Sequence, residues 1–206
     1  MNTGRGFTIV ELLIVIVVIG ILAVIAITSI TSAQLRAKVQ QNTSLAQAYG
    51  KALVAYATEN GNYPPGYTTW PCLGTGTTDI NNDGNYDCSW TGTTPEHQKS
   101  ASFDAAIRRY VDITAGPSDI ITVDINGKRL SGVTFWNITD GVIDGQPHYW
   151  YLGYIIKAPE TCKYGHLLTT TGWPAFSSTR PAAGYTWQEA DGGRTCLVKL
   201  PNPATL

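Results

Sequence analysis

An uninterrupted apolar run near the N-terminus constrains this chain more than any other feature. The sixteen residues Leu12 to Ile27, LLIVIVVIGILAVIAI, contain no polar side chain. With Phe7 to Val10 before it and Thr28 to Ile30 after it, the segment can cross about 30 Å of hydrocarbon as a helix. A buried helix of a soluble domain would show a polar face, and this run shows none. The sequence therefore predicts a membrane-inserted helix.

Two kinds of processing fit such a run. In the first, the run is a secretory signal that is removed before Gln34, where TSA offers small residues for cleavage. In the second, cleavage falls between Gly6 and Phe7, and the helix is retained. Glu11 favours the second, because a carboxylate in a bilayer costs roughly 2.5–3.5 kcal/mol and usually has a partner and a function.

Cleavage after Gly6 would supply that partner, because it creates an α-amine on Phe7, four residues before Glu11. We therefore expect the Glu11 carboxylate to be unsatisfied in a lone subunit and to meet a new amine after processing. The amine of the same chain and that of a neighbouring chain both remain open as its partner.

The residues GFTIVELL, 6–13, resemble the class III signal of type IV prepilins and pseudopilins. In that family a short basic leader ends in Gly, Phe follows, and Glu is the fifth residue of the mature chain. The resemblance implies that a membrane prepilin peptidase cuts after Gly6 and methylates the amine of Phe7. It also implies that Glu11 helps to dock each subunit onto a filament by meeting the N-terminal amine of a neighbour.

The predicted helix continues beyond the membrane segment. An amphipathic stripe with alternating spacings of four and three lines one helix face at positions 35, 39, 42, 46, 49, 53 and 56. Gly61 is a natural C-cap, and Pro64-Pro65 prevents continuation. Polar Asn42 and small Ala46 disfavour the alternative, a coiled-coil seam. We expect one helix from Phe7 to Asn60.

Strand patterns dominate the rest of the chain. Residues 148–157, HYWYLGYIIK, are aromatic and β-branched and predict a central strand. Asn126-Gly127 between alternating apolar runs predicts a hairpin, and the turn at 191–193 predicts a second one. Residues 101–111 predict a short helix.

The order of helix then strands predicts an α+β fold, in which an antiparallel sheet packs on the second half of the long helix. This is also the arrangement of the pilin fold, which the resemblance implies. We expect four parts: a leader, the membrane or filament-core half of the helix, the amphipathic half, and a globular head. They cover residues 1–6, 7–30, 31–60 and 61–206.

The four cysteines, none in a C-x-x-C pair, make a zinc site unlikely and predict two disulfides in an exported domain. Four cysteines allow three connectivities. Sequence proximity favours Cys72–Cys88 and Cys162–Cys196, but spacing alone leaves the pairing open.

Residues 79–87, DINNDGNYD, place oxygen-bearing side chains at the spacing of a calcium loop. The candidate ligands stand at positions 1, 3, 5, 7 and 9 and are Asp79, Asn81, Asp83, Asn85 and Asp87. Gly84 permits the sharp turn at position 6. Trp90 replaces the bidentate Glu of position 12, and an Asx-rich surface turn is the alternative interpretation. We expect Ca²⁺ at this loop.

No enzyme or nucleic-acid signature emerges. The net charge is −1, which gives no long-range field for DNA or RNA. The histidines His97, His148 and His166 lack metal-ligand spacing, and no G-x-S-x-G is present. We therefore expect a non-enzymatic protein without a nucleic-acid partner.

Together with these features, the resemblance implies a structural subunit of a type IV pilus. The resemblance implies a homo-oligomeric helical filament, a prepilin peptidase and a pilus assembly machinery as partners. It places the prepilin in the inner membrane and the mature chain in an extracellular filament used, for example, in adhesion or motility. The alternatives are a minor pilin or a type II secretion pseudopilin, and less favourably a membrane-anchored or secreted binding protein or enzyme.

Overall fold

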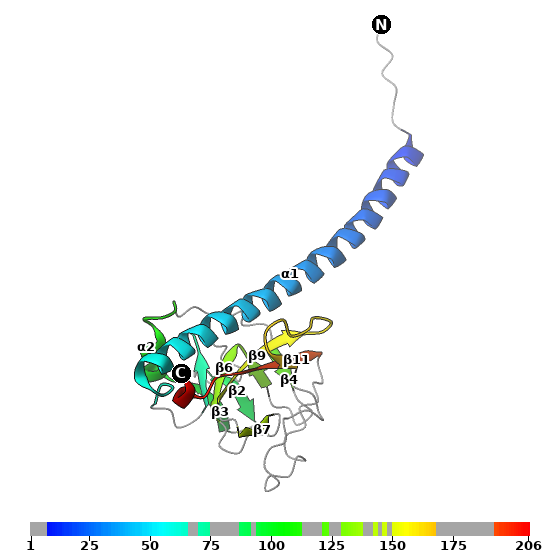
Figure 1. Ribbon diagram of the computed structural model, residues 1–206. Coiled ribbons are helices and arrows are strands. Elements are labelled where there is room, and N and C mark those ends of the chain that lie inside the picture. Colours follow the sequence, from blue (N-terminus) through cyan, green and yellow to red (C-terminus); the bar gives the residue numbers. More distant parts are fainter. Residues whose placement is uncertain are drawn as a thin grey trace. The chain divides into compact units, whose positions relative to one another are not determined.

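The computed structural model has the predicted α+β fold, with a long N-terminal helix followed by β-strands (Figure 1). It describes residues 8–65, 70–74, 87–91, 94–112, 121–123, 129–137, 142–143, 146–147, 150–167 and 192–206. The chain divides into two compact units, Met1–Ala37 and Lys38–Leu206, which are treated separately below. Helix α1, Ile9–Asn60, contributes to both.

In the first unit, α1 exposes its apolar side chains on all sides. The large apolar residues from Ile9 to Ile30 whose side chains are described are between 47 and 86 % exposed. By length and composition this helix is able to cross a membrane. Apolar surface of this extent requires lipid or other protein to cover it.

In the second unit, the remainder of α1 packs on the sheet through the predicted stripe (Figure 1). Tyr56 at its end is half-buried, and five stripe residues are buried: Val39, Asn42, Ala46, Tyr49 and Leu53. The helix ends at Asn60 as predicted. Gly61 follows in the left-handed region with φ 71°, and its N–H donates to the Ala57 carbonyl at 2.8 Å.

Nine strands form one sheet in the order β10-β11-β9-β6-β1-β3-β2-β5-β4. Its centre is an antiparallel group of four: β11 (Gly193–Lys199), β9 (Trp150–Lys157), β6 (Val133–Asn137) and β1 (Trp70–Leu73). Strand β9, which lies within the predicted 148–157, is central and has six consecutive buried residues. Both of its faces are therefore covered, which explains its nearly continuous apolar sequence.

The remaining strands extend the sheet on both sides. Strand β10 (His166–Leu167) pairs with β11, and four strands follow β1: β3 (Thr94–Lys99), β2 (Asp87–Thr91), β5 (Arg129–Ser131) and β4 (Ile121–Val123). The pair β1–β3 is parallel, in contrast to the antiparallel arrangement expected. Since β3 pairs antiparallel with β2, strands β1 and β2 run in opposite directions on either side of β3. Strands β7 (Val142–Ile143) and β8 (Gln146–Pro147) form a separate pair.

Local signals explain two smaller elements. Helix α2, Ala101–Ile107, begins after Ser100, whose Oγ accepts the Phe103 N–H at 3.3 Å. It is shorter than the predicted 101–111. Strands β4 and β5 form the first predicted hairpin, with Val123 paired to Arg129. Its Asn126-Gly127 turn, and the first arm of the second predicted hairpin, fall outside the described ranges.

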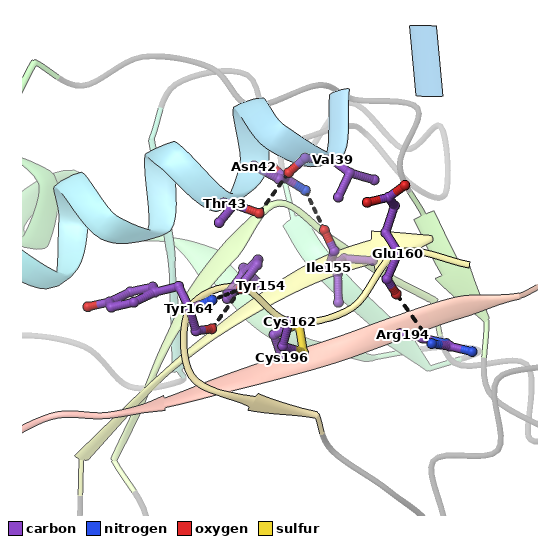
Figure 2. The surroundings of a disulfide bond; sticks show 10 residues. All are labelled: Val39, Asn42, Thr43, Tyr154, Ile155, Glu160, Cys162, Tyr164, Arg194 and Cys196. Carbon is purple, nitrogen blue, oxygen red and sulfur yellow. Dashed lines mark hydrogen bonds between the residues drawn. A yellow bond between two sulfur atoms is a disulfide. The ribbon is translucent and has the colours of Figure 1, made fainter. Parts of the chain in front are cut away.

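Asn42 shows why a polar residue interrupts the helix stripe. Strand β6 pairs with β9 only from Val133 onward, and Gly132 before it turns away with φ 67°. The Ile155 N–H still reaches the Gly132 carbonyl at 3.4 Å, but the Ile155 carbonyl is bound by Asn42 Nδ2 at 2.9 Å (Figure 2). The side chain thus supplies the donor that the sheet lacks at this point.

Candidate functional site

The start of α1 is a capping box formed by Thr8 and Glu11. The Thr8 N–H and the Thr8 hydroxyl both donate to Glu11 Oε2 at 2.8 Å, and the Glu11 N–H donates to Thr8 Oγ1 at 3.2 Å. Thr8 is the N-cap and Glu11 the third helical residue, so each satisfies a backbone N–H of the other. The helix consequently begins at Ile9. The predicted processing residues Gly6 and Phe7 lie before the first described residue.

This geometry corrects the expectation that Glu11 has no partner in a lone subunit. The sequence pattern Thr-x-x-Glu before an apolar run is the signature of a capping box and could have revealed the contact. Both residues follow the predicted cleavage point, so the mature chain retains them. A carboxylate offers about four acceptor positions. The box therefore leaves Glu11 with capacity to accept from an amine.

The chemical setting of Glu11 is otherwise apolar. It is the one charged residue between positions 8 and 35 of the sequence. Exposed apolar neighbours include Val10, Leu12 and Leu13. A charge in such a setting is poorly solvated once lipid or protein covers the helix. Once the helix is covered, a cationic group would interact with Glu11 more strongly than in water, because little water would compete there.

The disulfide Cys162–Cys196 joins the segment after β9 to β11, with a Cα–Cα distance of 5.7 Å (Figure 2). It is one of the two pairs that sequence proximity favoured. Tyr164, shortly after Cys162, is also held by hydrogen bonds. Tyr154 Oη donates to the Tyr164 carbonyl at 2.7 Å, and the Tyr164 N–H donates to Tyr154 Oη at 3.2 Å. Burial raises the pKa of both phenols above the ordinary value of tyrosine.

Tyr164 also meets α1 at Gly50. A Cβ built on Gly50 would lie 2.5 Å from Tyr164 Oη, so the glycine leaves room for the phenol. In addition, Arg194 of β11 donates through Nη1 to the Glu160 carbonyl at 3.2 Å. The residues that follow β9 are therefore held against α1 by Tyr164 and against β11 by Glu160 and the disulfide.

The disulfide Cys72–Cys88 is the other favoured pair, with a Cα–Cα distance of 5.8 Å. It joins β1 to β2, and the segment between these strands contains the predicted calcium loop. Asp87 begins β2. The candidates Asp79, Asn81, Asp83 and Asn85 fall in a part of the chain for which the structure gives no description. Within the described part, no three His, Cys, Asp or Glu side chains gather as a metal site.

Comparison with known protein families gives a match at the N-terminus. Residues 1–27 match the family model of the prokaryotic N-terminal methylation motif. No curated protein and no solved structure matches the chain. The match includes Gly6, Phe7, Thr8 and Glu11 together with the whole apolar run Leu12 to Ile27. It supports an N-terminus of the type IV pilin-like prepilin kind.

Proposed function

We propose that this protein is a structural subunit of a type IV pilus, which polymerises through the apolar half of α1 into an extracellular filament. The observation that carries the proposal is the methylation motif joined to the exposed apolar first half of α1. A prepilin peptidase would cut after Gly6 and methylate Phe7. The non-enzymatic role fits the pilin-like motif.

The proposed assembly follows from surface physics. Before assembly, lipid covers the apolar side chains of residues 9–30, and the head remains outside the membrane. In a filament the same side chains would be covered by helices of neighbouring subunits. The apolar side chains are covered both in lipid and in the filament, so their burial from water hardly changes on assembly. Helix packing and a polar contact must therefore favour the filament. Glu11, meeting the N-terminal amine of a neighbour, supplies that contact in this proposal.

A minor pilin or a type II secretion pseudopilin is the second candidate, favoured by the calcium-loop sequence 79–87. We propose that this loop binds Ca²⁺, with the Cys72–Cys88 disulfide joining the strands at its two ends. Immunogold imaging of intact cells distinguishes the two roles. Long surface fibres labelled for this chain support the major pilin, whereas short or tip-restricted labelling supports the alternative.

The mass and the N-terminal sequence of the mature protein test directly whether the chain is processed as a prepilin. The proposal predicts a chain that begins at N-methylated Phe7. A chain that begins at Gln34 would mean that the apolar run is a removed secretory signal, and the pilus proposal would be wrong. Such a result would favour a secreted binding protein or enzyme.

A further inference from the structure

Arg36 is the first charged residue after the apolar run of α1. Positions 12–35 carry no charged side chain. No acidic residue follows in the helix until Glu59, next to its end at Asn60, so the helix around Arg36 attracts anions rather than cations. The Arg36 side chain is exposed, and the buried stripe begins after it, at Val39. A positive charge thus directly follows the length of helix that is able to cross a membrane.

The position of Arg36 along the helix matches the depth of lipid headgroups. Helix α1 is continuous through this stretch, so its rise per residue gives distances along it. Arg36 is six residues beyond Ile30, which corresponds to about 9 Å along the axis. The headgroup layer is about 5–8 Å thick on each side of a hydrocarbon core of about 30 Å. When the apolar segment fills the core, the Arg36 Cα lies just outside this layer.

The direction of helical side chains brings the Arg36 guanidinium back toward the lipid. The Cα–Cβ bonds of an α-helix tilt toward its N-terminus, and a long side chain lies over the preceding turn. For Arg36 this turn contains Ser32 and Ala33, which are both exposed. The path to the headgroup layer is therefore open, and the small Ala33 side chain leaves room for a bound group.

Phosphate is the anion that phospholipids present at this depth. The planar guanidinium group matches a phosphate with two parallel N–H···O hydrogen bonds, a geometry that lysine cannot reproduce. Water is scarcer in the headgroup layer than in solution, so the charges attract each other more strongly there. The residue type at position 36 and its depth therefore point to the same ligand.

We propose that Arg36 binds the headgroup phosphate of a phospholipid, in the leaflet nearer the C-terminal end of α1, and thereby fixes the depth of the helix. Glu11 is 25 residues before Arg36, about 37 Å along the axis, and comes to lie close to the opposite boundary of the hydrocarbon. The carboxylate is thus kept out of the centre of the bilayer, where its charge is most costly. The inference rests on the proposed storage of the subunit in the membrane before assembly.

Depth measurements on the full-length chain in phospholipid vesicles test this assignment. The native cysteines are paired in disulfides, so Ala26→Cys gives one reactive thiol for a spin label inside the apolar run. Collision rates of the label with oxygen and with a nickel chelate report its depth. In vesicles of phosphatidylethanolamine and phosphatidylglycerol, Arg36→Gln should move the label toward the bilayer centre by about one helical turn, about 5 Å.

Two further variants serve as controls in the same vesicles. Lys51→Gln removes an exposed cation from the same helix, but about 30 Å beyond Ile30, and should leave the label depth unchanged. Arg36→Lys keeps the charge and loses the fork-shaped donor group, so it should move the label only part of the way.

Vesicles of digalactosyldiacylglycerol, a lipid without phosphate, separate a phosphate contact from the cost of placing any cation in hydrocarbon. In these vesicles the wild type and Arg36→Gln should hold the label at the same depth. Millimolar inorganic phosphate in the buffer should not restore a difference between them, because the proposed ligand is the phosphate fixed in the lipid layer.

Three results would overturn the inference. The first is an equal label depth in the wild type and Arg36→Gln in phospholipid vesicles. The second is the same shift in both kinds of vesicle, which would mean that the cost of burying a cation sets the depth. Both leave the pilus proposal intact, because N-terminal processing tests it separately. The third is a label exposed to water in every variant, which would refute storage in the membrane as well.

Discussion

The two halves of α1 differ in how their side chains find partners, although they belong to one helix. In the half Lys38–Asn60, a narrow stripe is buried against the sheet, and its polar member Asn42 binds a specific carbonyl. In the half Ile9–Ala37, apolar side chains are exposed on all sides, and Glu11 is held by Thr8 alone among the described residues. The second half is complete within one chain, whereas the first half requires lipid or other chains.

Replacing the two glycines of α1 should give the largest difference in head stability between the two halves of the helix. Gly50→Ala would place a methyl group against Tyr164 Oη. Because Tyr164 lies close to the Cys162–Cys196 disulfide and cannot move away easily, the change should destabilise the head by about 3 kcal/mol. Gly20 has no atom within 4 Å of an added Cβ, so Gly20→Ala should leave the head unchanged. Thermal unfolding of both variants in detergent measures the difference. Equal effects would refute the contrast between the halves.

Removing the polar group of the stripe should have a somewhat smaller effect. Asn42→Ala leaves the Ile155 carbonyl buried without its donor and should cost about 2 kcal/mol of head stability. Gln41→Ala, at the adjacent exposed position, is the control and should change stability little. Chemical denaturation of the two variants checks the prediction, which would be wrong if both behaved alike.

Breaking the capping box should have the smallest effect on the fold. Thr8→Ala removes the hydroxyl that donates to Glu11 and accepts the Glu11 N–H, and should cost about 1 kcal/mol of helix stability at this end. Thr8→Ser retains the hydroxyl and should restore the wild-type value. Amide hydrogen exchange of the first helical turn is the measurement. Unchanged protection in Thr8→Ala would show that the box does not hold the helix start.

Much of this organisation could be predicted from periodicity. The stripe 39–53, the helix end at Asn60 and the central strand β9 follow from residue spacing and from Gly61 with Pro64-Pro65. The parallel pair β1–β3 could not be predicted, because strand order depends on long-range pairing that local patterns do not encode.

In the candidate site, too, local sequence patterns predict some contacts, whereas others depend on long-range pairing. The Thr8–Glu11 contact is local, and a Thr-x-x-Glu pattern encodes it, so closer attention to helix capping would have found it. The disulfide pairs follow sequence proximity but required the fold to fix them. The contact of Tyr164 with Gly50 joins residues far apart in the sequence, and no spacing rule predicts it.

Filament assembly by a Glu11→Ala variant tests the central claim, that the first half of α1 is completed by other subunits. The variant should insert in the membrane and be cleaved normally, because the apolar run and the Gly6–Phe7 bond are unchanged. It should yield few filaments, measured as sheared surface protein and by electron microscopy. Glu59→Ala is the control, since it removes an exposed glutamate from the other half of the same helix. Normal filament numbers in Glu11→Ala would contradict the account.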